Sequence, residues 1–123
     1  MIPTVKECYD LMDQYGMLDN VREHSIVVAE VVRAISHGLV TSGVQISVDK
    51  AVAGALLHDI AKSQCLQTGG DHAALGREIC LKHHLDEIAD IVAEHIWLKS
   101  YSFDGVYSEK EIVYYGDKRV LHT

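Results

Sequence analysis

The chain has 123 residues, with 18 acidic against 11 basic side chains and a formal net charge of −7. This length suits one domain with one hydrophobic core, and a hydrophobic content of 48% excludes a disordered chain. The acidic balance argues against nucleic acid held by a basic surface, because such binding depends on clustered lysines and arginines. A small phosphorylated ligand is not excluded, since a metal site supplies positive charge locally.

Cysteine content and hydropathy predict the cellular compartment of the protein. The three cysteines are an odd number and form no CxxC pair, so the sequence predicts neither a disulfide framework nor a zinc ribbon. Free cysteines are typical of a reducing compartment, and we expect a cytoplasmic protein. The N-terminus lacks the apolar run of a signal peptide, and no apolar segment approaches the ~18 residues of a membrane span. We therefore expect no membrane partner.

Helical patterns dominate the chain, and the first two helices have clear beginnings. Thr4 followed by Glu7 is the sequence of a capping box, and Gly16 marks the end of the first helix. A second helix is expected from a cap at Asp19 or Asn20 to about residue 38. Its inward stripe repeats every three or four residues, at His24, Val28, Val31 and Ile35.

The third predicted helix lies at the centre of the domain. Ser47 is its expected cap, and it continues to about Lys62 through residues 51–57, which are apolar on all sides. The pair Gly69-Gly70 then breaks the chain, and Asp71 caps a fourth helix.

Two further helices complete an all-α domain of about six helices, which we expect to span residues 1–123. One spans about Leu85 to Leu98, and a polar, aromatic loop follows it. Ser108 and Glu111 form a second capping box, which opens a last helix to about Leu121. The chain stops six residues after Asp117, so we expect this final helix to be truncated or to end early.

Side chains that bind metal ions recur on every predicted helix after the first. His58 and Asp59 are neighbours in the most apolar segment, where a buried carboxylate is costly unless a metal or another charge compensates. On a helix the two side chains point about 100° apart, so both reach one ion only if it lies off the helix axis. The pair by itself is equally compatible with a salt bridge near a helix end. The other donors are His24, His72, His95 and Asp117.

Each of these donors alone is as compatible with an ordinary core or surface residue as with a ligand. Together they predict a metal site, because helical bundles build core metal sites from donors on facing helices. His83 and His84 are expected to be structural, and His37 and His122 to lie on the surface. The aromatic residues between 97 and 115 either stack on a nucleobase or pack against the core.

The ordered motifs resemble the HD superfamily of metal-dependent phosphohydrolases, in its HDIG-like branch of small stand-alone domains. Five segments carry the likeness over roughly residues 20 to 120: REHSIVVA at 22–29, GALLHDIAK at 54–62, DHAALG at 71–76, IVAEH at 91–95 and EIVYYGDK at 111–118. Two positions depart from the usual pattern. Ala61 stands where glycine is frequent, and Gly116 stands where alanine is usual.

The resemblance implies a compact HD-type helical bundle that holds one or two divalent metal ions. A first metal would be held by His24, His58, Asp59 and Asp117. A second metal would be held by His72 and His95 with Asp59 as the bridge, and because both histidines are present we favour a binuclear site. Imidazole and carboxylate ligands without thiolate suit iron or manganese, which we favour, and also zinc, cobalt and nickel.

The resemblance also implies hydrolysis of a phosphoester in a nucleotide or another small phosphorylated metabolite. A metal-activated hydroxide is the expected nucleophile, with Asp59 and Lys62 in catalytic roles. Lys62 and Lys118 are the candidates to bind the substrate phosphate, and Arg22 and Arg77 are weaker candidates. The competing interpretation for each of these cations is a solvated surface charge.

Two other functions stay open on the sequence alone. Related HD folds use the same ligands with iron to cleave carbon bonds with oxygen, so a di-iron oxygenase has the same signature. A non-catalytic sensor or binding module would tolerate a missing ligand, and this sequence lacks none of the six. No motif identifies the substrate, and the sequence leaves a homodimer open.

Overall fold

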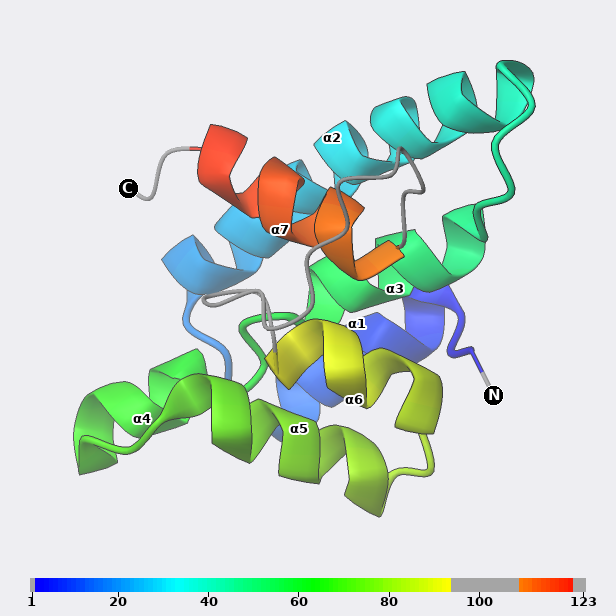
Figure 1. Ribbon diagram of the computed structural model, residues 1–123. Helices are drawn as coiled ribbons and strands as arrows, with labels where there is room; N and C mark the ends of the chain where they lie inside the picture. Colours follow the sequence, from blue (N-terminus) through cyan, green and yellow to red (C-terminus); the bar gives the residue numbers. More distant parts are fainter. Residues whose placement is uncertain (1, 94–108, 121–123) are drawn as a thin grey trace.

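The regular elements of the protein are α-helices. The computed structural model describes residues 2–93 and 109–120, and within these ranges no other regular element occurs. The helices follow in chain order as α1 Val5–Gln14, α2 Asp19–Thr41, α3 Val48–Leu57, α4 Lys62–Thr68, α5 His72–Lys82, α6 Asp86–Ala93 and α7 Glu109–Arg119 (Figure 1). The predicted all-α class is confirmed. In the same two ranges, no helix combines the length and the apolarity that crossing a bilayer would require.

Local capping chemistry sets three helix beginnings as the sequence predicts. Thr4 Oγ1 accepts a hydrogen bond from the Glu7 N–H at 3.1 Å, and Glu7 Oε1 accepts one from the Thr4 N–H at 2.9 Å. The side chains of Ser47 and Asp71 accept backbone hydrogen bonds in the first turns of α3 and α5. Gly16 follows the end of α1 with a φ of 63°, a conformation that favours glycine.

Both ends of α2 differ from the prediction. Leu18 is the N-cap residue, and its backbone N–H donates to Ser63 Oγ of α4 at 2.9 Å, so neither Asp19 nor Asn20 is the cap. Asp19 is instead the first helical residue, where its negative charge suits the positive end of the helix dipole. The helix continues past residue 38 to Thr41, because a glycine inside a helix costs only ~1 kcal/mol.

α3 is the central helix, as its sequence predicts. Residues 51–57 are all buried, and α3 packs against α1, α2, α6 and α7 (Figure 1). Within the predicted stripe of α2, His24 and Val28 are buried, but Val31 and Ile35 lie half-buried at its edge. The buried stripe comprises Val21, His24, Ser25, Val28, Ala29, Val32 and Ser36.

The helix predicted to continue to Lys62 ends at Leu57. In the next four residues the Ile60 N–H donates to the Leu57 carbonyl at 3.0 Å, and the Lys62 N–H donates to the Asp59 carbonyl at 2.9 Å. These three-residue turns interrupt the α-helix, and α4 begins at Lys62 as an unpredicted additional helix. The apolar sequence pattern gives no signal of this break, because the residues stay buried through Ala61.

The later helices agree with prediction where they are described. α6 begins at Asp86, one residue after the predicted start, and α7 ends at Arg119, two residues before the predicted end. The predicted continuation of α6 to Leu98 and the predicted cap Ser108 lie outside the described residues.

Three helix crossings are too close to accommodate a side chain at their glycines. A Cβ atom on Gly54 would lie 2.7 Å from Ile91 Cγ2, and one on Gly76 would lie 2.7 Å from Val92 Cγ1. α6 therefore packs directly on the backbones of α3 and α5. Gly116 of α7 makes the third such approach, toward α2.

Alanine at two helical glycines is expected to have opposite effects on stability. Gly54→Ala should lower the unfolding free energy by about 1–3 kcal/mol, because Ile91 is buried and its β-branched side chain has little freedom to turn away. Gly38→Ala should raise it by up to about 1 kcal/mol, since nothing lies within 4 Å of the added Cβ and alanine favours the helix. Urea unfolding of both variants checks this. A urea midpoint of Gly54→Ala at or above that of the wild-type protein would contradict the close crossing of α3 and α6.

Candidate metal centre

The turn after α3 brings His58 and Asp59 together in the interior. His58 is fully buried and Asp59 is 2% exposed. His58 is the C-cap residue of α3 and keeps helical dihedral angles, with φ −60° and ψ −30°. His58 Nε2 lies 3.3 Å from Asp59 Oδ2. The prediction of one continuous helix through this pair is wrong, because α3 ends at Leu57 and α4 begins at Lys62.

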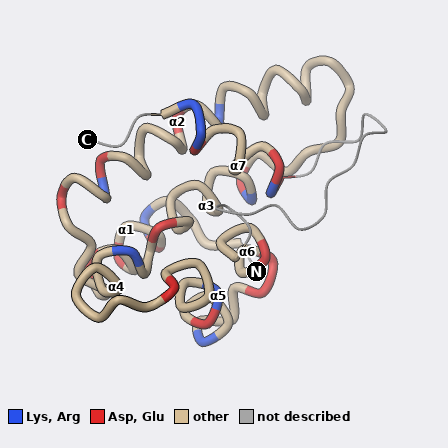
Figure 2. The backbone as a smooth tube through the Cα atoms, turned by 60° about the vertical axis from the view of Figure 1, so that its left-hand side comes forward, with Lys and Arg blue, Asp and Glu red and all other residues tan. Residues whose placement is uncertain are grey.

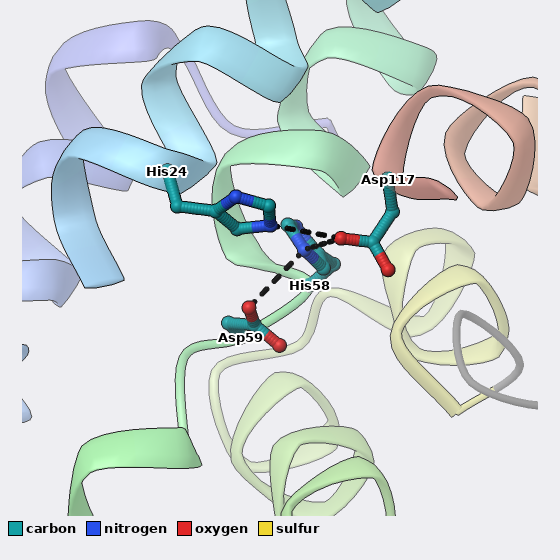
Figure 3. Close-up of side chains that lie close together, drawn as sticks. All are labelled: His24, His58, Asp59 and Asp117. Carbon is teal, nitrogen blue, oxygen red and sulfur yellow. Dashed lines mark hydrogen bonds and ion pairs between the residues drawn. The ribbon is translucent and has the colours of Figure 1, made fainter. Parts of the chain in front are cut away.

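His24 from α2 and Asp117 from α7 meet this pair (Figure 3). Asp117 Oδ1 lies 2.9 Å from His24 Nε2 and 3.1 Å from His58 Nε2. Each of the four residues offers one ligand atom, and these atoms all lie within 4.8 Å of one another. The mutual packing of α2, α3 and α7 thus unites three distant parts of the sequence in one cluster. We call His24, His58, Asp59 and Asp117 the buried cluster.

A backbone contact orients the His58 ring. His58 Nδ1 lies within hydrogen-bonding distance of the Ala55 carbonyl oxygen, which can only accept, so Nδ1 carries the hydrogen. Nε2 is thereby turned toward the carboxylates of Asp59 and Asp117. Metal-binding histidines are commonly fixed in this way, with one ring nitrogen donating to a carbonyl and the other facing the metal.

The charges of the buried cluster shift the pKa values of its members in opposite directions. Burial lowers the pKa of His58, but the negative charges of Asp59 and Asp117 and their hydrogen bonds outweigh it and raise the pKa to about 10. Burial raises the pKa of the Asp117 carboxyl, but the hydrogen bond and charge of His58, with the hydrogen bond from His24, hold it well below its usual range. Asp117 is therefore ionised at neutral pH, and His58 retains a second proton when no metal is bound.

The donor set of the buried cluster fits a divalent metal ion. Two imidazole nitrogens and two carboxylates are ligands that first-row divalent metals accept, and two carboxylate charges balance one dication. A cation among the Nε2 atoms would take the place of the proton that His58 otherwise carries. The four residues are those assigned to the first metal by the sequence motifs. Their role as ligands stays a prediction.

His72 lies next to the buried cluster at the beginning of α5. Its Nε2 is 3.6 Å from Asp59 Oδ1, whereas Asp59 Oδ2 faces His58. The two oxygens of one carboxylate thus face two different imidazoles. The His72 side chain is 25% exposed, so it connects the interior with the surface. His95, the other predicted ligand of a second metal, lies outside the described residues.

The two predicted phosphate-binding lysines both lie beside the buried cluster in the sequence. Lys62 begins α4, three residues after Asp59, and is half-buried. Lys118 places its Nζ 3.3 Å from Asp117 Oδ2 and 5.1 Å from the ring centre of Tyr114. Lys118 therefore contacts the second oxygen of the same carboxylate whose first oxygen faces the histidines.

The two weaker arginine candidates lie in different settings. Arg22 pairs with Asp13 and lies over the Tyr9 ring at 5.7 Å, so it links α2 to α1. Arg77 is exposed on α5. These positions give neither arginine a contact with the buried cluster that would support a role in phosphate binding.

Three of the remaining histidines, His37, His83 and His84, lie in the structural and surface positions expected of them. His83 ends α5, and its Nε2 lies 2.8 Å from the Tyr15 hydroxyl of α1. His84 follows in a turn with a φ of 61°, and His37 is exposed on α2. His122 and the aromatic residues between 97 and 107 lie outside the described residues.

The backbone oxygen of Ala55 is a functional group that the sequence motifs do not include. Side-chain identities do not predict this contact, because it depends on the tightening of the chain after Leu57. A histidine near the end of an apolar helix is only a weak sequence signal of such a contact between a side chain and the backbone.

Comparisons with known proteins place these motifs in one family. The model of the HD domain family matches residues 21–116. A tRNA (cytidine(56)-2'-O)-methyltransferase of Thermoplasma volcanium is 33% identical over 97 residues, which are 78% of this chain and 27% of that protein. Ribonuclease Y of Mycoplasma mycoides is 39% identical over 74 residues, which are 60% of this chain and 16% of that protein.

A protein of unassigned activity from Methanocaldococcus jannaschii is 32% identical over 76 residues, 62% of this chain and 44% of its own length. The chain thus spans less than half of each of these three relatives. No solved structure matches the chain.

Without metal, stability is expected to fall as the pH rises above neutral. The pKa of His58 is raised from 6.5 to about 10 on folding, so the folded chain keeps a proton that the unfolded chain has lost. Between about pH 7 and about pH 8.5 the unfolding free energy should fall by about 1 kcal/mol per pH unit. Urea unfolding in the presence of a chelator measures this slope.

Two comparisons complete the pH experiment. His58→Gln should remove most of the slope, and saturating Mn²⁺ should also remove it, because the metal replaces the proton. An unchanged unfolding free energy over this pH range in chelator would contradict the coupling of His58 to the two carboxylates.

Proposed function

The chain belongs to the HD domain family, and on that premise we propose that it is a metal-dependent phosphohydrolase. Its proposed substrate is a phosphoester of a nucleotide or of another small phosphorylated metabolite. The observation that carries the proposal is the buried cluster, in which four nitrogen and oxygen donors from three parts of the chain converge in the interior.

Each member of the buried cluster has a proposed part in holding the metal. The Nε2 atoms of His24 and His58 and one oxygen each of Asp59 and Asp117 are the proposed ligands. The Ala55 carbonyl keeps the His58 ring in the orientation that this needs. When bound, a divalent metal supplies a Lewis acid for phosphate oxygens and lowers the pKa of a water molecule toward ~7.

We extend the proposal to a second metal at Asp59. The support is that Asp59 Oδ1 lies 3.6 Å from His72 Nε2 while Asp59 Oδ2 faces His58, the arrangement that a bridging carboxylate needs. His95 is the further ligand proposed from the sequence motifs. Imidazole and carboxylate ligands suit iron or manganese, and these two metals are the proposed occupants.

Lys62 and Lys118 are the proposed partners of the substrate phosphate. The Lys118 side chain is 48% exposed and lies against an anionic oxygen of Asp117. An arriving phosphate would compete with this carboxylate for the Lys118 ammonium group. Lys62 follows Asp59 by three residues and begins the helix on the other side of the turn. Positive charge at both places would stabilise negative charge that develops on phosphate oxygens.

The relatives support a phosphoester as the chemical class of the substrate. A ribonuclease acts on phosphodiester bonds, and this chain matches 16% of the ribonuclease Y of Mycoplasma mycoides. The lysines and arginines of the described residues are spread over several helices and interspersed with acidic residues (Figure 2). Together with the net charge of −7, this favours a small substrate over a long RNA strand.

We propose one HD domain over residues 1–123, supported by a single core whose members run from Cys8 to Val113.

Asp117→Asn is expected to remove the metal, and Asp90→Asn is the matched control. Both changes replace a carboxylate by an amide of the same shape, but Asp90 is exposed on α6 and lies outside the buried cluster. Wild-type protein loaded with Mn²⁺ should retain at least one metal per chain by elemental analysis. Hydrolysis of p-nitrophenyl phosphate and of bis(p-nitrophenyl) phosphate should fall on the order of 100-fold in Asp117→Asn and stay unchanged in Asp90→Asn.

Two results would overturn this proposal. One is a folded wild-type protein that retains none of iron, manganese, zinc, cobalt or nickel. The other is a metal-loaded protein that releases no phosphate or nitrophenol but consumes oxygen when loaded with iron, which would assign it to the di-iron oxygenases.

His72→Ala tests the second metal separately from the first. It should reduce the metal content from about two per chain to about one, because His72 faces Asp59 but is not a member of the buried cluster. His83→Ala removes a half-buried histidine that is hydrogen-bonded to Tyr15, and it should leave the metal content unchanged. Equal metal content in wild-type protein and His72→Ala would reject the second site and leave the first in place.

A further inference from the structure

We infer that Gly116 is a positioning residue of the metal centre, which acts through its contact with Val32. The contact sets the distance between α7 and α2 and so places the Asp117 carboxylate against His24. The inference rests on the proposed metal site and adds a determinant of its geometry that binds neither metal nor substrate itself.

The approach of α7 to α2 at Gly116 leaves no room for a side chain. A Cβ atom on Gly116 would lie 2.7 Å from Val32 Cγ2 and 3.7 Å from Val28 Cγ1. Non-bonded carbon atoms attract at about 3.5–4.0 Å, so the first of these distances is strongly repulsive and the second is ordinary contact. Alanine at this position therefore forces a movement against Val32.

Val32 has little freedom to yield. It is fully buried in the middle of α2, and a valine in a helix has one strongly preferred side-chain rotamer. The Val32 methyl group cannot turn into solvent, and the surrounding interior is filled by other core side chains. The strain is relieved by displacing α7 away from α2.

A displacement of α7 moves one member of the buried cluster relative to the other three. Asp117 follows Gly116 directly and comes from α7, whereas His24 comes from α2 and the remaining two from the turn after α3. His24 and Val32 lie on the same buried stripe of α2, two helical turns apart. The contact at Val32 therefore controls the same helix pair that sets the 2.9 Å distance between His24 Nε2 and Asp117 Oδ1.

Metal sites are sensitive to displacements of this size. Ligand distances in functional sites hold to about 0.2 Å, and supporting residues must keep geometry within about 0.5 Å. A shift of a few tenths of an ångström in α7 is therefore enough to weaken the Asp117 ligand while the helix bundle stays folded.

Gly76 provides a matched control for the loss of packing. Its added Cβ would also lie 2.7 Å from a methyl group of a fully buried valine, Val92. That contact joins α5 to α6, which carry no member of the buried cluster, but α5 begins with His72, the proposed ligand of the second metal. Gly76→Ala is therefore the control for the imidazole signals of His24 and His58 and not for Mn²⁺ affinity. Gly76→Ala thus imposes a similar clash without moving Asp117 toward or away from His24.

The test compares Gly116→Ala, Val32→Ala, their double variant and Gly76→Ala. In metal-free protein, long-range proton–nitrogen NMR spectra should show displaced imidazole signals of His24 and His58 in Gly116→Ala. Mn²⁺ affinity, measured by calorimetry, should fall about 10–100-fold in the same variant, as it does when supporting contacts of a metal site are lost. Val32→Ala in the double variant makes room for the added Cβ and should restore both the spectra and most of the affinity.

Each outcome decides the inference. Unchanged imidazole signals and affinity in Gly116→Ala, or displacements of the His24 and His58 imidazole signals equal to those in Gly76→Ala, overturn it and leave Gly116 a packing residue. If wild-type protein binds no metal, the proposed function fails, but the imidazole signals of metal-free Gly116→Ala and its double variant still test the placement of Asp117. If Gly116→Ala does not fold, Val32→Ile enlarges the other side of the contact, and it must displace the same imidazole signals for the inference to stand.

Discussion

The burial of two carboxylates beside two imidazoles is the constraint on which the rest of this structure depends. Asp59 and Asp117 are 2% and 4% exposed, and removing each ionised carboxylate from water costs several kcal/mol unless positive charge and hydrogen bonds compensate. The compensating groups are His24 and His58, and Asp117 meets them from a distant part of the chain. The close packing of α2, α3 and α7 is therefore needed to stabilise the buried charges as well as to bury the apolar core.

Several local features serve this one requirement. His58 and Asp59 lie directly after α3, the central helix, and the Ala55 carbonyl directs the His58 ring. Gly116 allows α7 to approach α2, which brings Asp117 within reach of both histidines. A divalent cation would satisfy the same carboxylates more fully than a proton does, so metal binding and folding are expected to support each other.

The sequence predicts this domain where its signals are local or periodic. The Thr4–Glu7 capping box needs only neighbouring residues, and His24 is recognisable as an inward donor because it lies on an apolar stripe. The break after Leu57 was not predictable in this way, because an apolar pattern reports burial and not the hydrogen bonds of the backbone. The contact of Gly116 with Val32 depends on the distance between two helices, which no single segment of the sequence encodes. The cytoplasmic location stays a prediction from the sequence, which leaves a homodimer open.

The central claim is that the buried cluster is a metal site, and anomalous X-ray scattering from crystals grown with Mn²⁺ tests it most directly. A manganese peak is expected within bonding distance of the Nε2 atoms of His24 and His58 and of one oxygen each of Asp59 and Asp117. A crystal that shows the four side chains still bonded to one another, with no manganese peak among them, would contradict it.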